Sequence, residues 1–159
     1  MNPSVNLLAQ RLATCFGIGW SPIAPGTLAS LAALPFAWLL ALFGWQGIAA
    51  GALLATGVGI WACGVYARKH GVHDPAECVL DEVAGQWFTL IPVAVEMRGG
   101  DWRPYVMGFI FFRLFDIWKP WPVSAVEKMP GGFGIMMDDV LAGVIAAALL
   151  YGTLAIMLV

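Results

Sequence analysis

The chain has 159 residues, of which 60% are hydrophobic and only 11% are charged, and its formal net charge is −2. Soluble domains carry about a quarter charged residues, so this composition favours one membrane domain, residues 1–159, over a very apolar soluble helical bundle. No basic run is present to bind nucleic acid. Cys15, Cys63 and Cys78 fit neither a disulfide framework nor a zinc site, and we expect them to serve in packing.

The first 30 residues predict a short helix and then an irregular segment. Leu7, Leu8 and Leu12 have loosely helical spacing, which suits a helix at the membrane surface, and no cleavage site of a signal peptide follows. The segment 17–30 reads GIGWSPIAPGTLAS. It fits a turn with helix caps at Ser21 and Thr27, or a backbone cradle for an anion at a helix N-terminus.

Five apolar runs follow, and they predict an all-α, integral membrane helical bundle with about four to five membrane-embedded helices. The runs are 28–45, 48–67, 83–97, 104–118 and 139–159. The first, second and last are long enough to cross a bilayer. The third and fourth are short, so they could also dip in and out together or be buried by the longer helices.

Charged residues gather in three segments between or beside these runs. The segment 70–82 holds five potential ligands: His73, Asp74, Glu77, Asp81 and Glu82. A solvated acidic loop, with Asp81 as a helix cap, is the alternative to a site. Asp81 and Glu82 favour the site because apolar sequence flanks them.

The second segment is a polar stripe on an apolar helix. Arg113, Asp116 and Lys119 are three residues apart and share one face, and Pro120 is expected to stop the helix. An ion-pair chain that only holds helices together is the alternative. The third segment is an expected loop over 120–138, rich in glycine, after which Asp138 and Asp139 are expected to open the last helix.

Alternating crossings place all these groups on one side of the membrane. Residues 17–27, 68–82 and 119–138 then share a face, and the turns 45–47 and 98–103 lie opposite. The first face has more Lys and Arg residues, which predicts that active-site loops face the cytoplasm, with the N-terminus inside and the C-terminus outside.

Carboxylates with few histidines suit Mg²⁺, and nearby Arg and Lys suit phosphate. At a membrane face this combination indicates a phosphatase acting on a lipid phosphate. The sequence lacks the Cys and Arg spacing of cysteine phosphatases and the separated histidines of histidine-nucleophile lipid phosphatases, which leaves metal-assisted attack by water or a carboxylate.

The competing class of protein is a small transporter or channel with Arg113 and Asp116 on an ion path. A structural membrane subunit would not require so many convergent carboxylates.

Four segments carry a family resemblance: SPIAPGT, HDPAECVLDE, FRLFDIWKPWP and GGFGIMMDDVLAG. In order and spacing they resemble the phosphatidylglycerophosphatase A family over roughly residues 16–150. The resemblance implies a multi-pass enzyme of the bacterial cytoplasmic (inner) membrane, which hydrolyses phosphatidylglycerophosphate to phosphatidylglycerol and phosphate with Mg²⁺. Some relatives look like soluble all-helical bundles, so the fold could be a compact, partly embedded bundle.

The family's acidic positions correspond to Asp81, Glu82, Asp116, Asp138 and Asp139, and its basic positions to Arg113 and Lys119. From these positions we hypothesise the following roles. The expected metal ligands are Asp81, Glu82, Asp138 and Asp139. The expected substrate-binding residues are Ser21, Thr27, Arg113, Lys119 and Gly132. The expected catalytic residues are Asp116, Arg113, Lys119 and Asp81, where Asp116 orients Arg113 or acts as nucleophile or general base. The Gly- and Ala-rich helix faces permit a homo-oligomer.

Overall fold

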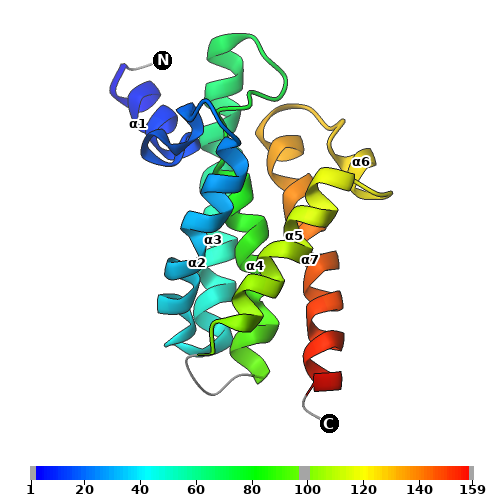
Figure 1. The fold of residues 1–159 in the computed structure, drawn as a ribbon. Helices are drawn as coiled ribbons and strands as arrows, with labels where there is room; N and C mark the ends of the chain where they lie inside the picture. The colour runs from blue at the N-terminus through cyan, green and yellow to red at the C-terminus, as the bar shows by residue number, and fades with distance from the viewer. Residues whose placement is uncertain (1–2, 97–100, 158–159) are drawn as a thin grey trace.

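The computed structural model describes residues 3–96 and 101–157, and it is all-α, as the sequence predicts (Figure 1). Seven α-helices and one 3₁₀ helix form these described parts. In chain order they are α1 (Pro3–Ala13), η1 (Cys15–Trp20), α2 (Pro25–Ala41), α3 (Gly44–His70), α4 (Leu80–Glu96), α5 (Arg103–Trp118), α6 (Val123–Val126) and α7 (Gly131–Met157).

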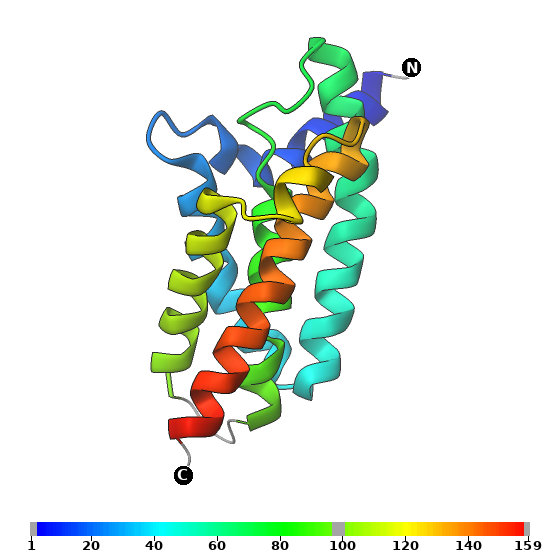
Figure 2. The same ribbon diagram turned by 90° about the vertical axis from the view of Figure 1, so that its right-hand side faces the viewer.

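Helix α4 lies at the centre of the bundle. It packs most extensively against α7 and α3, and it also contacts α2 and α5. Figures 1 and 2 show the long helices side by side, with α1 across one end and the C-terminus at the other. A helix surrounded in this way presents residues to several neighbours, so side chains from its first turns can meet groups on different helices.

Glycines allow α4 and α7 to approach each other closely. A Cβ added to Gly143 of α7 would overlap the carbonyl oxygen of Gly85 in α4. The Thr89 hydroxyl, 3.2 Å from the Gly143 carbonyl oxygen, ties the helices together beside this contact. Small residues at helix interfaces are typical of membrane bundles, where van der Waals contact replaces the hydrophobic effect.

This contact yields a prediction about stability. Gly143→Ala should destabilise the protein by about 1–3 kcal/mol, since the methyl group has no room. Gly152→Ala is the matched control in the same helix, because its added Cβ would meet no described atom within 4 Å. The control should stabilise by about 0.5–1 kcal/mol, because alanine loses less backbone entropy than glycine. Thermal unfolding midpoints in one detergent would measure both, and equal midpoints would contradict the close approach.

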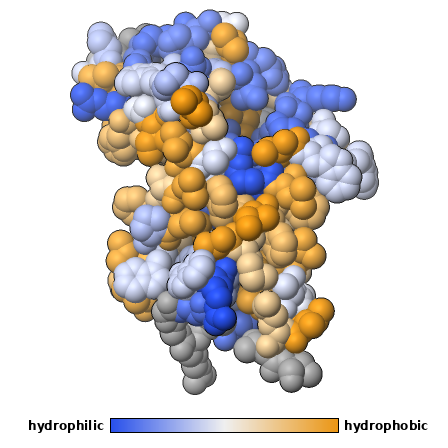
Figure 3. Space-filling model, viewed as in Figure 1, coloured by the Kyte–Doolittle hydropathy of each residue, from blue (hydrophilic) through white to orange (hydrophobic). Residues whose placement is uncertain are grey.

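Two helices, α3 and α7, are long and apolar enough to cross a membrane, with 27 residues each. Helix α2 is a shorter apolar helix. Figure 3 shows hydrophilic side chains gathered at the end that carries α1, and mainly apolar side chains over the helices below it. Leu54, Ile117 and Ile156 are 69%, 72% and 78% exposed. So large an apolar surface is typical of contact with lipid or another protein.

The helix boundaries correct several sequence predictions. The apolar run 28–45 is not one helix, because α2 ends at Ala41 and α3 begins at Gly44, whose φ is +73°. The expected loop over 120–138 was wrong: α6 forms within it, and α7 already begins at Gly131. Asp138 and Asp139 therefore lie two turns inside α7 instead of opening it.

Helix α5 ends where the sequence predicts, just before Pro120. Lys119 has φ of +46° and caps the helix, so the expected helical stripe stops at Asp116. The predicted turn over 98–103 is only partly visible, because residues 98–100 lie outside the described parts. Its last residue, Arg103, begins α5.

Candidate functional site

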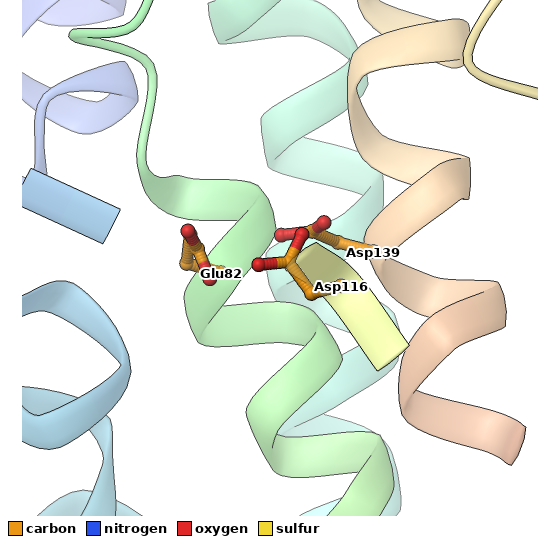
Figure 4. A group of neighbouring side chains, drawn as sticks. All are labelled: Glu82, Asp116 and Asp139. Carbon is orange, nitrogen blue, oxygen red and sulfur yellow. The ribbon is translucent and has the colours of Figure 1, made fainter. Parts of the chain in front are cut away.

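Three carboxylates from three different helices meet inside the bundle. Glu82 comes from the first turn of α4, Asp116 from the last turn of α5 and Asp139 from α7. One carboxylate oxygen of each lies within 4.8 Å of the other two. Figure 4 shows Asp116 and Asp139 pointing toward one another, with Glu82 beside them on α4. We call these three residues the acidic cluster, and its spacing could hold a metal ion.

The acidic cluster is largely shielded from solvent. The side chains of Glu82 and Asp116 are 12% and 11% exposed, and residue Asp139 is 4% exposed. Three carboxylates so close together repel each other, and burial removes the water that would screen them. When its members are ionised, such a group requires compensating positive charge, from the protein or from a bound cation.

Arg113 supplies part of this positive charge. Its Nη1 lies 2.9 Å from Oδ2 of Asp116, one turn further along α5, and it also forms an ion pair with Glu82. Its side chain is 16% exposed. Asp139 forms no ion pair within the described residues. One guanidinium against three carboxylates leaves net negative charge, which is the electrostatic condition for binding a cation.

Helix α2 completes the surroundings of Glu82. The buried Ser30 hydroxyl lies 3.0 Å from Oε2 of Glu82 and 3.5 Å from Nη1 of Arg113. A Cβ added to Gly26 would overlap Oε1 of the same carboxylate. A side chain at position 26 would therefore displace the Glu82 carboxylate from its place beside α2.

A second ionic group lies next to the acidic cluster. Lys119 Nζ is 2.9 Å from Oδ2 of Asp138 and 2.5 Å from Oε1 of Glu127. Burial disfavours the charge on Lys119, but its hydrogen bonds to Glu127 and Asp138 outweigh that effect and raise the pKa of the ammonium. Lys119 is therefore charged at neutral pH and links the C-terminal ends of α5 and α6 to α7.

The other predicted metal ligands lie beside the acidic cluster. Asp138 binds Lys119 with one oxygen, and its other oxygen accepts the Asp139 backbone N–H at 3.0 Å. Asp81 is buried, and its Oδ1 accepts the Glu82 backbone N–H at 2.9 Å. Within the described residues Asp81 forms no ion pair. The structure thus adds Asp116 to Glu82 and Asp139, and places Asp81 and Asp138 next to the group.

The predicted substrate-binding residues of the loop and the glycine segment are placed differently. The Ser21 hydroxyl bonds within its own turn, accepting the Ile23 N–H and donating to the Ile23 carbonyl oxygen. Thr27 is half-buried in the first turn of α2. Gly132 packs directly on α3, where an added Cβ would overlap the carbonyl oxygen of Ile60. Gly132 therefore allows α3 and α7 to approach each other closely.

Sequence reasoning missed Ser30 and Glu127 as members of the site. Ser30 lies in the irregular segment 17–30 and Glu127 in the expected loop 120–138, and neither residue was assigned a role from the sequence. Neither has a sequence signal stronger than its neighbours, because both contacts depend on how helices pack. The buried Gln86, one turn after Glu82 on α4, was also missed. A polar residue in a run of apolar ones was the available signal.

The cysteines offer no nucleophile. Burial raises the pKa of Cys15 to about 12, and the nearby Asp81 carboxylate contributes. A thiol with this pKa is protonated at neutral pH and is a poor nucleophile. Cys63 and Cys78 are buried among apolar residues. The packing role predicted for the cysteines agrees with these surroundings.

Comparisons with known proteins show which family the chain resembles. The family model for Phosphatidylglycerophosphatase A matches residues 11–154. Phosphatidylglycerophosphatase A of Escherichia coli (strain K12) is 43% identical over 141 residues, which cover 88% of this chain and 80% of that protein. The Haemophilus influenzae protein of the same name is 36% identical over 142 residues, covering 88% and 85%.

A third relative has a different name. A Bacteroides thetaiotaomicron protein named "Putative phosphatidylinositol-3-phosphatase" is 42% identical over 150 residues, which cover 87% of this chain and 89% of that protein. No solved structure matches this chain. The family model and the two relatives named Phosphatidylglycerophosphatase A show that the chain belongs to the phosphatidylglycerophosphatase A family.

Proposed function

We propose that this chain hydrolyses the terminal phosphate monoester of phosphatidylglycerophosphate, releasing phosphatidylglycerol and inorganic phosphate. The observation that carries the proposal is the buried acidic cluster with Arg113 beside it, in a chain that belongs to the phosphatidylglycerophosphatase A family. The transporter alternative requires polar groups along the length of the helices. Arg113 and Asp116 instead pair with each other.

Mg²⁺ is the metal that fits this site best. Its ligands would be Glu82, Asp116 and Asp139, with Asp81 and Asp138 close enough to act through water or at a second ion. The donor set consists of carboxylate oxygens, which hard cations prefer, and it carries more negative charge than Arg113 balances. When bound, Mg²⁺ would polarise the phosphate and lower the pKa of a bound water.

Two cations of the chain would bind the substrate phosphate. Arg113 is placed at the edge of the acidic cluster, and a guanidinium binds phosphate with two parallel hydrogen bonds. Lys119, held by Glu127 and Asp138, adds a second positive charge at the same end of the bundle. Both would stabilise the negative charge that develops on the phosphoryl oxygens. Substrate contacts of Ser21, Thr27 and Gly132 stay predictions.

Hydrolysis needs a water that attacks phosphorus while the bond to the glycerol oxygen breaks. Asp138 is neutralised by Lys119, whereas Asp81 has no cationic partner within the described residues. Asp81 is therefore the better general base, taking the proton of the attacking water. The departing glycerol oxygen then takes up a proton, so that one water is consumed for each phosphate released.

The membrane arrangement is proposed together with the activity. Helices α3 and α7 would cross the bacterial inner membrane, and α2, α4 and α5 would be embedded beside them. The polar end with Arg11, Arg68, Lys69, Lys119 and Lys128 would face the cytoplasm, following the positive-inside rule. A homo-oligomer stays a prediction.

The test is phosphate release from phosphatidylglycerophosphate in detergent micelles. We expect release in Mg²⁺, no release in excess chelator, and recovery when Mg²⁺ is added back. Release that persists in chelator would exclude the metal. A folded preparation that releases no phosphate would refute the proposed activity.

A second substrate is worth testing because of the Bacteroides relative. The same assay with phosphatidylinositol 3-phosphate and phosphatidic acid would compare kcat/KM for three phosphomonoesters. We expect phosphatidylglycerophosphate to be the best of the three, as the two relatives named phosphatidylglycerophosphatase A indicate. A higher value for phosphatidylinositol 3-phosphate would assign the chain to the second substrate.

A further inference from the structure

Two buried polar groups beside the acidic cluster have no hydrogen-bond partner among the described residues. One is the Gln86 side chain, in which neither the amide nitrogen nor the amide oxygen is bonded. The other is Nε of Arg113. Gln86 is 0% exposed. Burying an amide without hydrogen bonds is costly, so an apolar residue would be the stable choice unless the amide has a task.

Helix geometry places these two groups between α4 and α5. Gln86 lies four residues after Glu82, so both project from the same face of α4. Glu82 contacts Arg113 on that face. One turn beyond Gln86, Thr89 and Leu90 lie where an added Cβ on Gly108 of α5 would reach. Gln86 therefore lies between two points at which α4 touches α5.

The antiparallel course of α4 and α5 supports this placement. Helices α4 and α5 run in opposite directions (Figure 1). Arg113 of α5 contacts Glu82 of α4, and an added Cβ on Gly108 would meet Leu90, so Gln86 lies opposite the part of α5 between Gly108 and Arg113. The Nε of Arg113 is on the stem of the side chain, and the Nη1 beyond it contacts Glu82 and Asp116.

We propose that Gln86 is a positioning residue for Arg113. When Glu82 and Asp116 bind a cation, Arg113 loses its two carboxylate partners. The amide oxygen of Gln86 then accepts the Nε–H, and the guanidinium keeps both Nη groups directed at the substrate phosphate. Gln86 acts only through Arg113, and its role rests on the phosphatase activity proposed above.

Gln86→Met tests this role, because methionine has nearly the same length and no hydrogen-bonding amide. We expect kcat for the lipid phosphate to fall by about 10- to 100-fold, the usual effect of losing such a supporting hydrogen bond, with KM nearly unchanged. The thermal unfolding midpoint should stay equal or rise, since an unpartnered amide is removed. A structural role for Gln86 would give the opposite pair of results, a lower midpoint and an unchanged kcat.

Thr89→Val is the matched control on the same helix. It also removes a buried polar group, but Thr89 bonds to the carbonyl oxygens of Gly85 and Gly143, away from Arg113. We expect a lower unfolding midpoint and a kcat within twofold of the unaltered protein. Should Gln86→Met fold poorly, Gln86→Leu provides the same comparison.

A double-mutant cycle with Arg113→Lys isolates the pair. Lysine has no Nε–H for Gln86 to accept. In the Arg113→Lys background, Gln86→Met should therefore cause little further loss in the single-turnover rate of phosphate release. An equal loss in both backgrounds would overturn the inference, as would a Gln86→Met enzyme with unchanged kcat. Inactivity of the unaltered protein would instead refute the proposed function, so the two failures are distinguishable.

Discussion

Asp139→Asn is expected to abolish Mg²⁺-dependent phosphate release. The change keeps the size of the side chain but removes one of three carboxylates that lie within 4.8 Å of one another. We expect kcat/KM to fall by more than the roughly 10- to 100-fold that changes around a metal site cause, because a direct ligand is lost. Phosphate release measured over a series of Mg²⁺ concentrations would show the loss.

The same variant should behave differently in thermal unfolding. Without Mg²⁺ it should be more stable than the unaltered protein, because Asp139 has no ion-pair partner within the described residues and its charge repels the other two carboxylates of the cluster. Mg²⁺ should raise the midpoint of the unaltered protein and not that of the variant. Asp101→Asn, at the exposed pair with Arg103, is the control and should respond to Mg²⁺ normally. An active Asp139→Asn enzyme would remove the acidic cluster from the mechanism.

Arg113→Met is expected to have the second large effect, on both stability and turnover. Methionine preserves the apolar stem but leaves Glu82 and Asp116 buried without their cation. Breaking a buried ion pair in this way typically costs about 3–5 kcal/mol. Turnover should fall by about 10²–10³-fold, the effect of losing a group that stabilises transition-state charge.

Adding Mg²⁺ separates these two effects. A cation bound to the acidic cluster would replace the missing positive charge, so the unfolding midpoint of Arg113→Met should recover in Mg²⁺ while its turnover stays low. Arg103→Met is the matched control, since Arg103 also pairs with an aspartate but lies exposed at the other end of α5. It should change neither quantity noticeably. If turnover recovered along with stability, Arg113 would serve only to balance charge, and its substrate contact would be refuted.

Several features followed from the sequence because they depend on local chemistry. Long uncharged runs separated by turn residues predicted an all-α bundle, and the structure confirms it. Pro120 correctly predicted the end of α5, because proline disfavours a helical residue before it. The spacing of Arg113 and Asp116 correctly predicted their contact, because residues three apart are neighbours on a helix.

The composition of the acidic cluster depended on tertiary structure. Sequence reasoning grouped Asp81 with Glu82 and Asp138 with Asp139 as adjacent ligands. Consecutive residues on a helix point about 100° apart, so the rotation of the helix in the bundle decides which of two neighbours faces a given group. Because α7 begins at Gly131, Asp138 and Asp139 both lie inside this helix and point in different directions. Asp139 faces the cluster, while Asp138 binds Lys119.

By itself, the sequence determined the helical class, the four family motifs and the set of charged residues from which a site could be built. Only tertiary packing decided which of them meet. Glu82, Asp116 and Asp139 come from three helices, and their meeting depends on the close approach of α4 and α7 at Gly85 and Gly143. Such contacts are set by the rotation and separation of whole helices, and no spacing along the chain records those quantities.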